Sequence, residues 1–152
     1  MPQSLAYNYI HFVTSTKNRQ NLILPHIQDK LYGYIGGICK TLESPALQIG
    51  GIEDHIHILT VLSKKVSLVT FAEEVKKGSS KWMKLQGEEF ENFYWQGGYG
   101  AFSVNPKETE IVKRYIQNQK ENHKKQTFKE EYLEFLQLYE INYKQEFIFD
   151  DV

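Results

Sequence analysis

Two histidines separated by one residue, His55 and His57, have a spacing that would allow both side chains to bind one metal ion. On a β-strand, residues i and i+2 point to the same face of the sheet, so both imidazoles can converge on one ion while Ile56 points to the other face. If the segment is a strand, the pair predicts a divalent-metal site. The same pair is also compatible with two histidines on a half-exposed strand, so its partners must decide between these interpretations.

Tyr115 and Gln119 supply such partners, because residues four apart stack on one face of a helix. The amide oxygen of Gln119 can ligate a hard divalent cation. The phenol of Tyr115 has an ordinary pKa of about 10, so it becomes a useful nucleophile only beside a metal or beside an electrophile that a metal has polarised. Taken alone, Tyr115 is more typical of a core aromatic than of a nucleophile, since apolar Val112 and Ile116 flank it.

Three further histidines occur in the chain. His123 lies four residues beyond Gln119 and is a candidate for the same metal site, although a histidine at a helix end also interacts favourably with the helix dipole. His11 and His26 have no evident partner in the sequence. The sequence therefore leaves the role of His123 open.

Regular periodicity identifies the elements that must position these residues. Strand patterns occur in four segments: residues 5–15, 46–52, 55–62 and part of 95–104. Helix patterns occur in four others: residues 26–43, from Ser67 to about Lys84, from Asn105 to about Lys124, and from Thr127 to about Tyr139. We expect Ser67 to open the second of these helices, and Asn105 and Thr127 to cap the third and the fourth. The order β-α-β-β-α-β predicts a ferredoxin-like (RRM-like) α+β fold, an antiparallel sheet with helices packed on it. A C-terminal helix carrying Tyr115 and a further helix follow it.

The composition bounds the class of protein. The 152 residues are 41% hydrophobic and 24% charged, which is typical of one globular domain and excludes disorder or a collagen-like chain. We find no linker or internal repeat, so we expect a single domain over residues 1–152. The single cysteine, Cys39, cannot form an internal disulfide, and neither a signal peptide nor an apolar membrane span is evident. We therefore expect a cytoplasmic protein.

Charge is distributed unevenly along the chain. The net charge is −1, from 18 Lys and Arg against 19 Asp and Glu, which excludes a uniformly basic nucleic-acid binder. Residues 61–86 and 105–129 each carry a charge of +4, whereas residues from Glu130 onward carry −6. This pattern predicts one basic face around the metal site, with acidic surface elsewhere.

Five motifs in order resemble the HUH single-tyrosine transposases of the smallest bacterial insertion sequences, a family related to the repeat-associated tyrosine transposases. Each motif is weak alone, but five at plausible intervals across nearly the whole chain are specific. They are Tyr9-Ile-His-Phe-Val-Thr-Ser-Thr-Lys-Asn-Arg19, Gly51-Ile-Glu-Asp-His-Ile-His-Ile-Leu59, Lys77-Gly-Ser-Ser-Lys-Trp82, Trp95-Gln-Gly-Gly-Tyr-Gly-Ala-Phe-Ser-Val104, and Tyr115-Ile-Gln-Asn-Gln119 with His123 and Phe128 beyond.

The resemblance implies roles for particular residues. It makes Tyr115 the nucleophile, His55 and His57 the histidine pair, and Gln119 the third ligand of a divalent metal, Mg²⁺ or Mn²⁺. It implies cleavage of single-stranded DNA to a 5′-phosphotyrosine and a free 3′-hydroxyl. The 3′-hydroxyl of another strand can then attack the phosphotyrosine and reverse this step. One phosphoester is exchanged for another, so no nucleotide cofactor is needed.

The resemblance also implies partners. These are single-stranded DNA with hairpin (imperfect palindrome) ends and a second copy of the chain, in a homodimer whose subunits share active sites. The protein would act in the bacterial cytoplasm, at the nucleoid. We select five bases as candidate DNA contacts: Lys17, Arg19, Lys76, Lys77 and Lys81.

Two alternative functions stay open at this point. The chain is also compatible with a catalytically inactive or domesticated ferredoxin-like nucleic-acid-binding module, which would bind hairpins without cleaving them. A metal-dependent hydrolase of small phosphoesters is the third hypothesis. The basic segments and the absence of a second His/Asp cluster in the sequence disfavour it.

Overall fold

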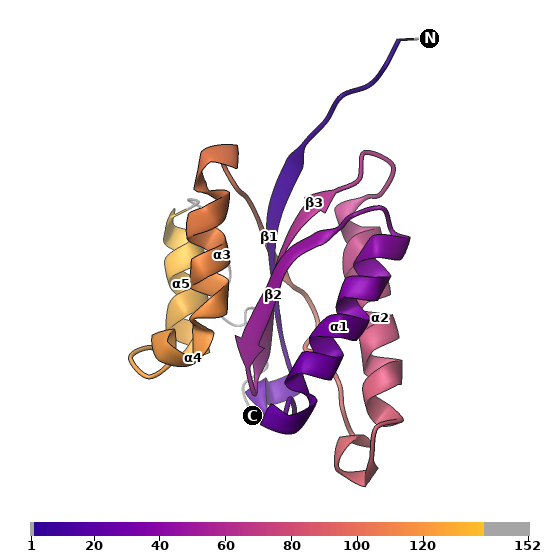
Figure 1. The fold of residues 1–152 in the computed structure, drawn as a ribbon. Coiled ribbons are helices and arrows are strands. Elements are labelled where there is room, and N and C mark those ends of the chain that lie inside the picture. The colour runs from indigo at the N-terminus through magenta and orange to yellow at the C-terminus, as the bar shows by residue number, and fades with distance from the viewer. Residues whose placement is uncertain (1, 139–152) are drawn as a thin grey trace.

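The computed structural model describes residues 2–138, in which a four-stranded antiparallel sheet lies between two layers of helices (Figure 1). The strands lie in the order β2-β3-β1-β4, which is the ferredoxin-like arrangement that the sequence predicts. Their bounds are β1 (Asn8–Ser15), β2 (Ala46–Ile52), β3 (His55–Leu62) and β4 (Gly100–Ser103). The bounds of β2 and β3 match the prediction, whereas β1 begins three residues later than expected.

Helices α1 (Pro25–Thr41) and α2 (Leu68–Lys84) cover one face of the sheet. The side chain of Ser67 accepts a hydrogen bond from the backbone N–H of Thr70 at 3.1 Å, so it caps α2 as predicted. The main hydrophobic core lies in this layer. Its fully buried members include Phe12, Leu31, Ile35, Ile56, Ile58, Phe71 and Val75.

Helices α3 (Thr109–Gln117), α4 (Gln119–Asn122) and α5 (Phe128–Leu138) cover the other face. A smaller core of Val13, Phe102, Phe128 and Leu136 holds α5 against the sheet. Strand β3 is therefore covered on both sides, and its first six residues are all buried. Three short 3₁₀ turns complete the described elements: η1 (Lys17–Arg19), η2 (Glu88–Phe90) and η3 (Pro106–Glu108).

The helix expected from Asn105 to about Lys124 is broken, so that prediction is wrong. Asn105 accepts a hydrogen bond from the Lys107 N–H at 2.9 Å, but it caps the 3₁₀ turn η3 rather than an α-helix. Helix α3 ends before Asn118, and α4 begins at Gln119. The next cap is as predicted, because the Thr127 hydroxyl accepts the Glu130 N–H at 3.2 Å. The predicted end of this last helix, near Tyr139, lies outside the described residues.

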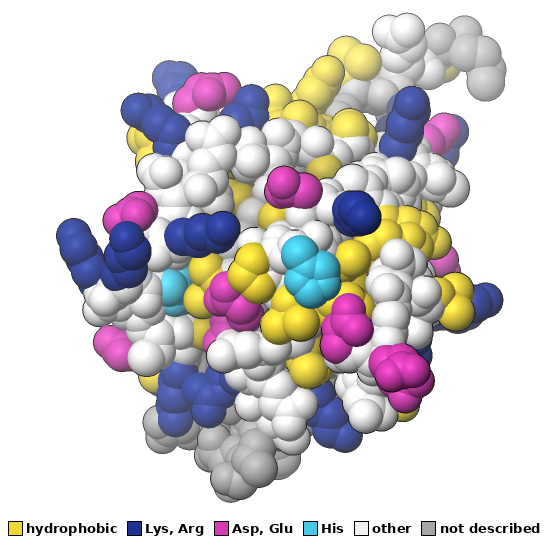
Figure 2. All heavy atoms as spheres, turned by 60° about the horizontal axis from the view of Figure 1, so that its bottom comes forward, with side chains coloured by type: hydrophobic (Ala, Val, Ile, Leu, Met, Phe, Trp, Pro, Cys, Tyr) yellow, Lys and Arg dark blue, Asp and Glu magenta, His cyan; other side chains and the backbone are white. Residues whose placement is uncertain are grey.

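The prediction of one basic face around the metal site is wrong. Residues 61–86 include α2 and residues 105–129 include α3, and these two helices lie on opposite faces of the sheet (Figure 1). On the face drawn in Figure 2, Lys and Arg side chains are scattered and interspersed with acidic ones. Most of the acidic tail lies outside the described residues. Within residues 2–138, no helix has the length and apolar character needed to cross a membrane.

Candidate metal and nucleophile site

His55 and His57 point from β3 into the layer that α3–α5 cover, while Ile56 points into the opposite core, as strand alternation predicts. Both histidines are 0% exposed, and their ring centroids lie 5.0 Å apart. This burial excludes the interpretation of two histidines on a half-exposed strand.

The structure brings Tyr115 and Gln119 to this pair. The Oε1 atom of Gln119 lies 3.0 Å from Nε2 of His55, and Gln119 is buried. The Tyr115 ring lies edge-on to the His57 ring, with centroids 5.8 Å apart. The four residues selected from the sequence therefore meet in one cluster within a single chain, even though the helix that was expected to hold Tyr115 and Gln119 is broken between them.

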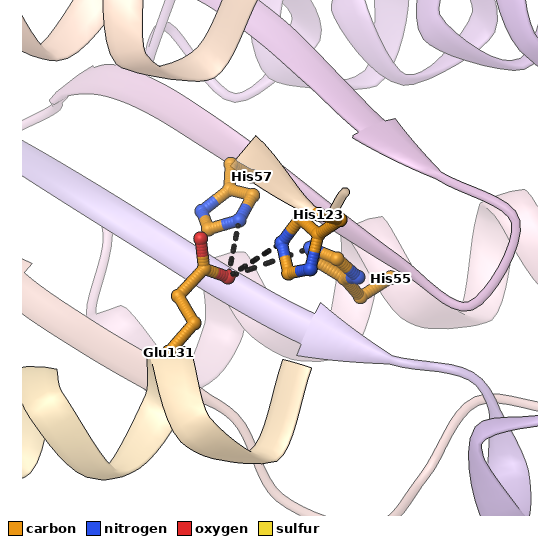
Figure 3. Close-up of side chains that lie close together, drawn as sticks. All are labelled: His55, His57, His123 and Glu131. Atoms are coloured by element: carbon orange, nitrogen blue, oxygen red, sulfur yellow. Dashed lines mark hydrogen bonds and ion pairs between the residues drawn. The ribbon is translucent and has the colours of Figure 1, made fainter. Parts of the chain in front are cut away.

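Glu131 of α5 is the residue at this site that the sequence analysis missed (Figure 3). Its Oε1 atom lies 3.1 Å from Nε2 of His57, 3.3 Å from Nε2 of His123 and 3.5 Å from Nε2 of His55. Its Oε2 atom accepts a hydrogen bond from the Tyr115 hydroxyl. Glu131 is only 1% exposed, so a single buried carboxylate joins the nucleophile candidate to three imidazoles.

The sequence does carry a signal for Glu131. Apolar or aromatic residues stand at Phe128, Tyr132, Phe135 and Leu136, and Glu131 occupies a position on the same helical face. An acid on an apolar stripe is a buried charge, and buried charges in proteins are paired or bind metals.

Two other histidines join the cluster. The side chain of His123 is 5% exposed, and its ring centroid lies 4.5 Å from that of His55. His11 is buried, and its Nε2 lies 2.8 Å from Nδ1 of His57, so it has a partner that the sequence did not reveal. The register explains the contact, because Val13 of β1 pairs with His57 and His11 lies two positions along the same face. His26 lies apart from the site, exposed on α1 near Glu89.

Neighbouring groups orient both strand histidines. Nδ1 of His55 lies 2.7 Å from a carboxylate oxygen of Asp54, and Nδ1 of His57 faces His11. Both Nε2 atoms therefore point inward toward Glu131. Histidines that bind metals are usually held by their second nitrogen in this way, so the residues present fit a divalent ion.

The electrostatics of the cluster centre on the ionised Glu131. Burial alone would raise the pKa of this carboxyl, but its contacts with the three imidazoles hold the pKa well below its usual range. Burial alone would lower the pKa of His55, but hydrogen bonds to Asp54 and Glu131 raise it to about 9.

Three groups next to Glu131 and His55, namely His11, His57 and Tyr115, stay neutral. Burial lowers the pKa of His57, and burial next to His57 lowers the pKa of His11 to about 3. Burial raises the pKa of Tyr115, and Glu131 raises it further, so the phenol keeps its proton. A buried anion among imidazoles is an environment that favours a bound cation.

The five candidate DNA contacts do not lie together. Lys17 and Arg19 follow β1 at the end of the sheet next to Asp54, whose carbonyl accepts the backbone N–H of Thr16. The ammonium of Lys76 donates to the carbonyls of Gln96 and Gly98 at 2.6 and 2.7 Å. It thereby stabilises the loop of residues 96–99 that precedes β4. The remaining two, Lys77 and Lys81, are exposed on α2, across the sheet from Tyr115.

Solved structures share this fold. One is a candidate transposase from Deinococcus radiodurans R1, with a TM-score of 0.60 and 18% identity over 78% of this chain and 96% of that chain. Another is a REP-associated tyrosine transposase bound to a REP hairpin, with a TM-score of 0.59 and 18% identity over 81% of this chain and 74% of that chain. The fold is thus one that transposases use.

The sequence itself identifies the family. The family model described as transposase IS200 like matches residues 4–119, which is most of the chain, so the protein belongs to the IS200-like transposase family. A search of curated proteins finds no match. The matched segment contains His55, His57, Tyr115 and Gln119 but ends before His123 and Glu131.

Proposed function

We propose that this transposase cleaves and rejoins single-stranded DNA at hairpin ends, with Tyr115 as the nucleophile and with His55, His57 and Gln119 as ligands of Mg²⁺ or Mn²⁺. The observation that supports the proposal is the position of Tyr115, whose ring packs edge-on against His57 at 5.8 Å. A phenol at that position can reach a phosphate bound beside the imidazoles.

The reaction exchanges one phosphoester for another. The Tyr115 oxygen loses its proton and forms a bond to phosphorus, the bond from phosphorus to the 3′ oxygen breaks, and the 3′ oxygen gains a proton. A bound divalent ion would polarise a non-bridging oxygen of the phosphate. The carboxylate of Glu131 holds the phenol by accepting its hydrogen bond, and Asp54 fixes the ring of His55.

DNA hairpins are the proposed substrate because a structural neighbour, the REP-associated tyrosine transposase, is bound to a REP hairpin. Lys17 and Arg19 are our proposed backbone contacts near the site, since they lie at the end of the sheet that carries Asp54. Lys77 and Lys81 would contact DNA only where it wraps past α2. We also propose that the protein acts in the cytoplasm.

We further propose a homodimer, on the strength of the family resemblance. In the structure, Tyr115 lies against His57 of the same chain, so each subunit can hold a site without sharing it. Light scattering coupled to size-exclusion chromatography would measure the mass in solution. Mixing a Tyr115→Phe chain with a His57→Ala chain would restore activity only if the subunits share sites.

Covalent trapping tests the proposed chemistry. The protein is incubated with Mn²⁺ and single-stranded hairpin DNA from the ends of its own element, and the adduct is resolved by denaturing electrophoresis. We expect an adduct with the wild type and none with Tyr115→Phe, whereas Tyr34→Phe, which removes a phenol on α1, keeps it. An undiminished adduct in Tyr115→Phe would refute the assignment. Hairpin binding without an adduct under any metal would instead support the binding-module alternative.

A further inference from the structure

His123 and Glu131 lie beyond the segment that the family model matches, yet both side chains reach the histidine pair. Their side chains are 5% and 1% exposed, respectively. Neither ring nitrogen of His123 makes a hydrogen bond to a described residue, although Nε2 lies 3.3 Å from Oε1 of Glu131. A buried imidazole without hydrogen bonds that points into a cluster of ligand atoms is a feature that metal binding would explain.

The three distances from Glu131 to the imidazoles match those between donors around a tetrahedral ion. One ligand atom from each of His55, His57, His123 and Glu131 lies within 4.8 Å of all the others. In a tetrahedral centre with metal–ligand bonds of about 2.0–2.1 Å, neighbouring donors are roughly 3.3–3.4 Å apart. The three separations between Oε1 of Glu131 and the imidazole Nε2 atoms, 3.1, 3.3 and 3.5 Å, bracket that value.

The surrounding hydrogen bonds leave the required nitrogen atoms available. With Nδ1–H of His55 donating to Asp54, the lone pair of a neutral His55 lies on Nε2. Nδ1 of His57 lies 2.8 Å from Nε2 of His11, and in the tautomer whose Nδ1–H donates to His11 the lone pair of His57 also lies on Nε2. A donor set of three imidazoles and one carboxylate is suited to zinc-like ions, whereas Mg²⁺ prefers oxygen ligands and water.

We propose that His123 and Glu131 complete the metal centre with His55 and His57, forming a four-donor site that binds a transition-metal ion such as Zn²⁺ or Co²⁺ in preference to Mg²⁺. The inference rests on the proposed function only in that both use the same histidine pair. Gln119, whose Oε1 lies 3.0 Å from Nε2 of His55, lies next to this set and is not one of the four donors that the DNA-free protein offers the ion. The C-terminal helix α5 thereby becomes part of the metal site.

Metal titration without DNA tests the proposal. The full chain is stripped of metal, Co²⁺ is added while the visible absorption that reports coordination geometry is recorded, and Zn²⁺ affinity is measured by competition with a coloured chelator. We expect the visible absorption of tetrahedral Co²⁺. We also expect that Mg²⁺ on the order of 1 mM does not displace the bound Co²⁺, because Mg²⁺ demands octahedral oxygen coordination.

Two variants and two matched controls complete the design. Glu131→Gln and His123→Ala should each weaken Zn²⁺ binding by at least about tenfold, since even residues that merely support ligands cost 10- to 100-fold in affinity when changed. Glu134→Gln changes an exposed acid of the same helix, and His26→Ala removes an exposed histidine, so both should bind as the wild type does. Circular dichroism checks that each variant is folded, and His123→Asn replaces His123→Ala if that variant is not.

Wild-type protein provides a readout that needs no variant. Zn²⁺ should raise the melting temperature more than Mg²⁺ at equal concentration, because only a ligand that binds the folded state tightly stabilises it. Unchanged Zn²⁺ affinity in either folded variant, or equal stabilisation by the two metals, would overturn the four-donor site. Failure of the proposed function is distinguishable, because it appears as a missing DNA adduct while Zn²⁺ binding still depends on Glu131 and His123.

Discussion

Replacing Gly50 by alanine would test whether the close packing of α3 against the sheet is needed for Tyr115 to react with DNA, as we propose. Gly50 lies in β2, opposite His57 in the strand pairing, and directly beneath Ile116 of α3. A Cβ atom at this position would lie 2.5 Å from the backbone oxygen of Ile116 and 3.0 Å from its Cγ2 atom. The oxygen cannot rotate away, because it belongs to the helix backbone.

The clash sets the size of the expected effect. Ordinary van der Waals contact begins at 3.4 Å, so α3 must retreat from the sheet by about 0.9 Å. Overpacking of this kind costs about 1–3 kcal/mol of stability, which is only part of the free energy of unfolding of a domain of this size. A misplacement of about 1 Å at reacting groups can slow a reaction on the order of 100-fold. We therefore expect a folded protein in which the proposed nucleophile, Tyr115, reacts much more slowly.

The assay compares the initial rate of adduct formation with the free energy of unfolding in urea. Gly50→Ala should slow adduct formation at least about tenfold while lowering stability by about 1–3 kcal/mol. Gly33→Ala is the matched control, because a Cβ on this exposed helical glycine of α1 meets nothing within 4 Å. It should keep the wild-type rate and raise stability by roughly 0.5–1 kcal/mol. An adduct rate in Gly50→Ala within about twofold of the wild type would refute the reasoning.

Two further predictions concern the neighbourhood of the site and the core. Asp54→Asn weakens the hydrogen bond at 2.7 Å that orients His55, so metal affinity should fall by about 10- to 100-fold in the chelator competition assay; wild-type affinity would show that Asp54 does not orient the ligand. Burial raises the pKa of the Cys39 thiol to about 12, and the thiolate is the reactive form. Mass spectrometry should therefore find Cys39 unmodified by iodoacetamide at pH 8 in the folded protein and fully modified in denaturant, and rapid modification of the folded protein would contradict its burial.

The strands and the shared face of His55 and His57 were predictable because their signals are local. The alternation that places His55 and His57 on one face is a property of any strand, and the bounds of β2 and β3 match the pattern of the sequence. The caps at Ser67 and Thr127 also depend only on residues within one helical turn. The break at Asn118 was not predicted, because no proline or glycine marks it between Thr109 and Asn122.

The sequence by itself determined the family, the ferredoxin-like order of elements and the candidate residues Tyr115, His55, His57 and Gln119. Only the tertiary structure decided what surrounds them. Glu131 meets His57 across 74 positions of sequence, and no local periodicity encodes a contact between a strand and a helix so far apart. The two basic segments, residues 61–86 and 105–129, were expected on one face but lie on opposite faces of the sheet (Figure 1). The path of the chain, not its composition, decides which face a helix covers.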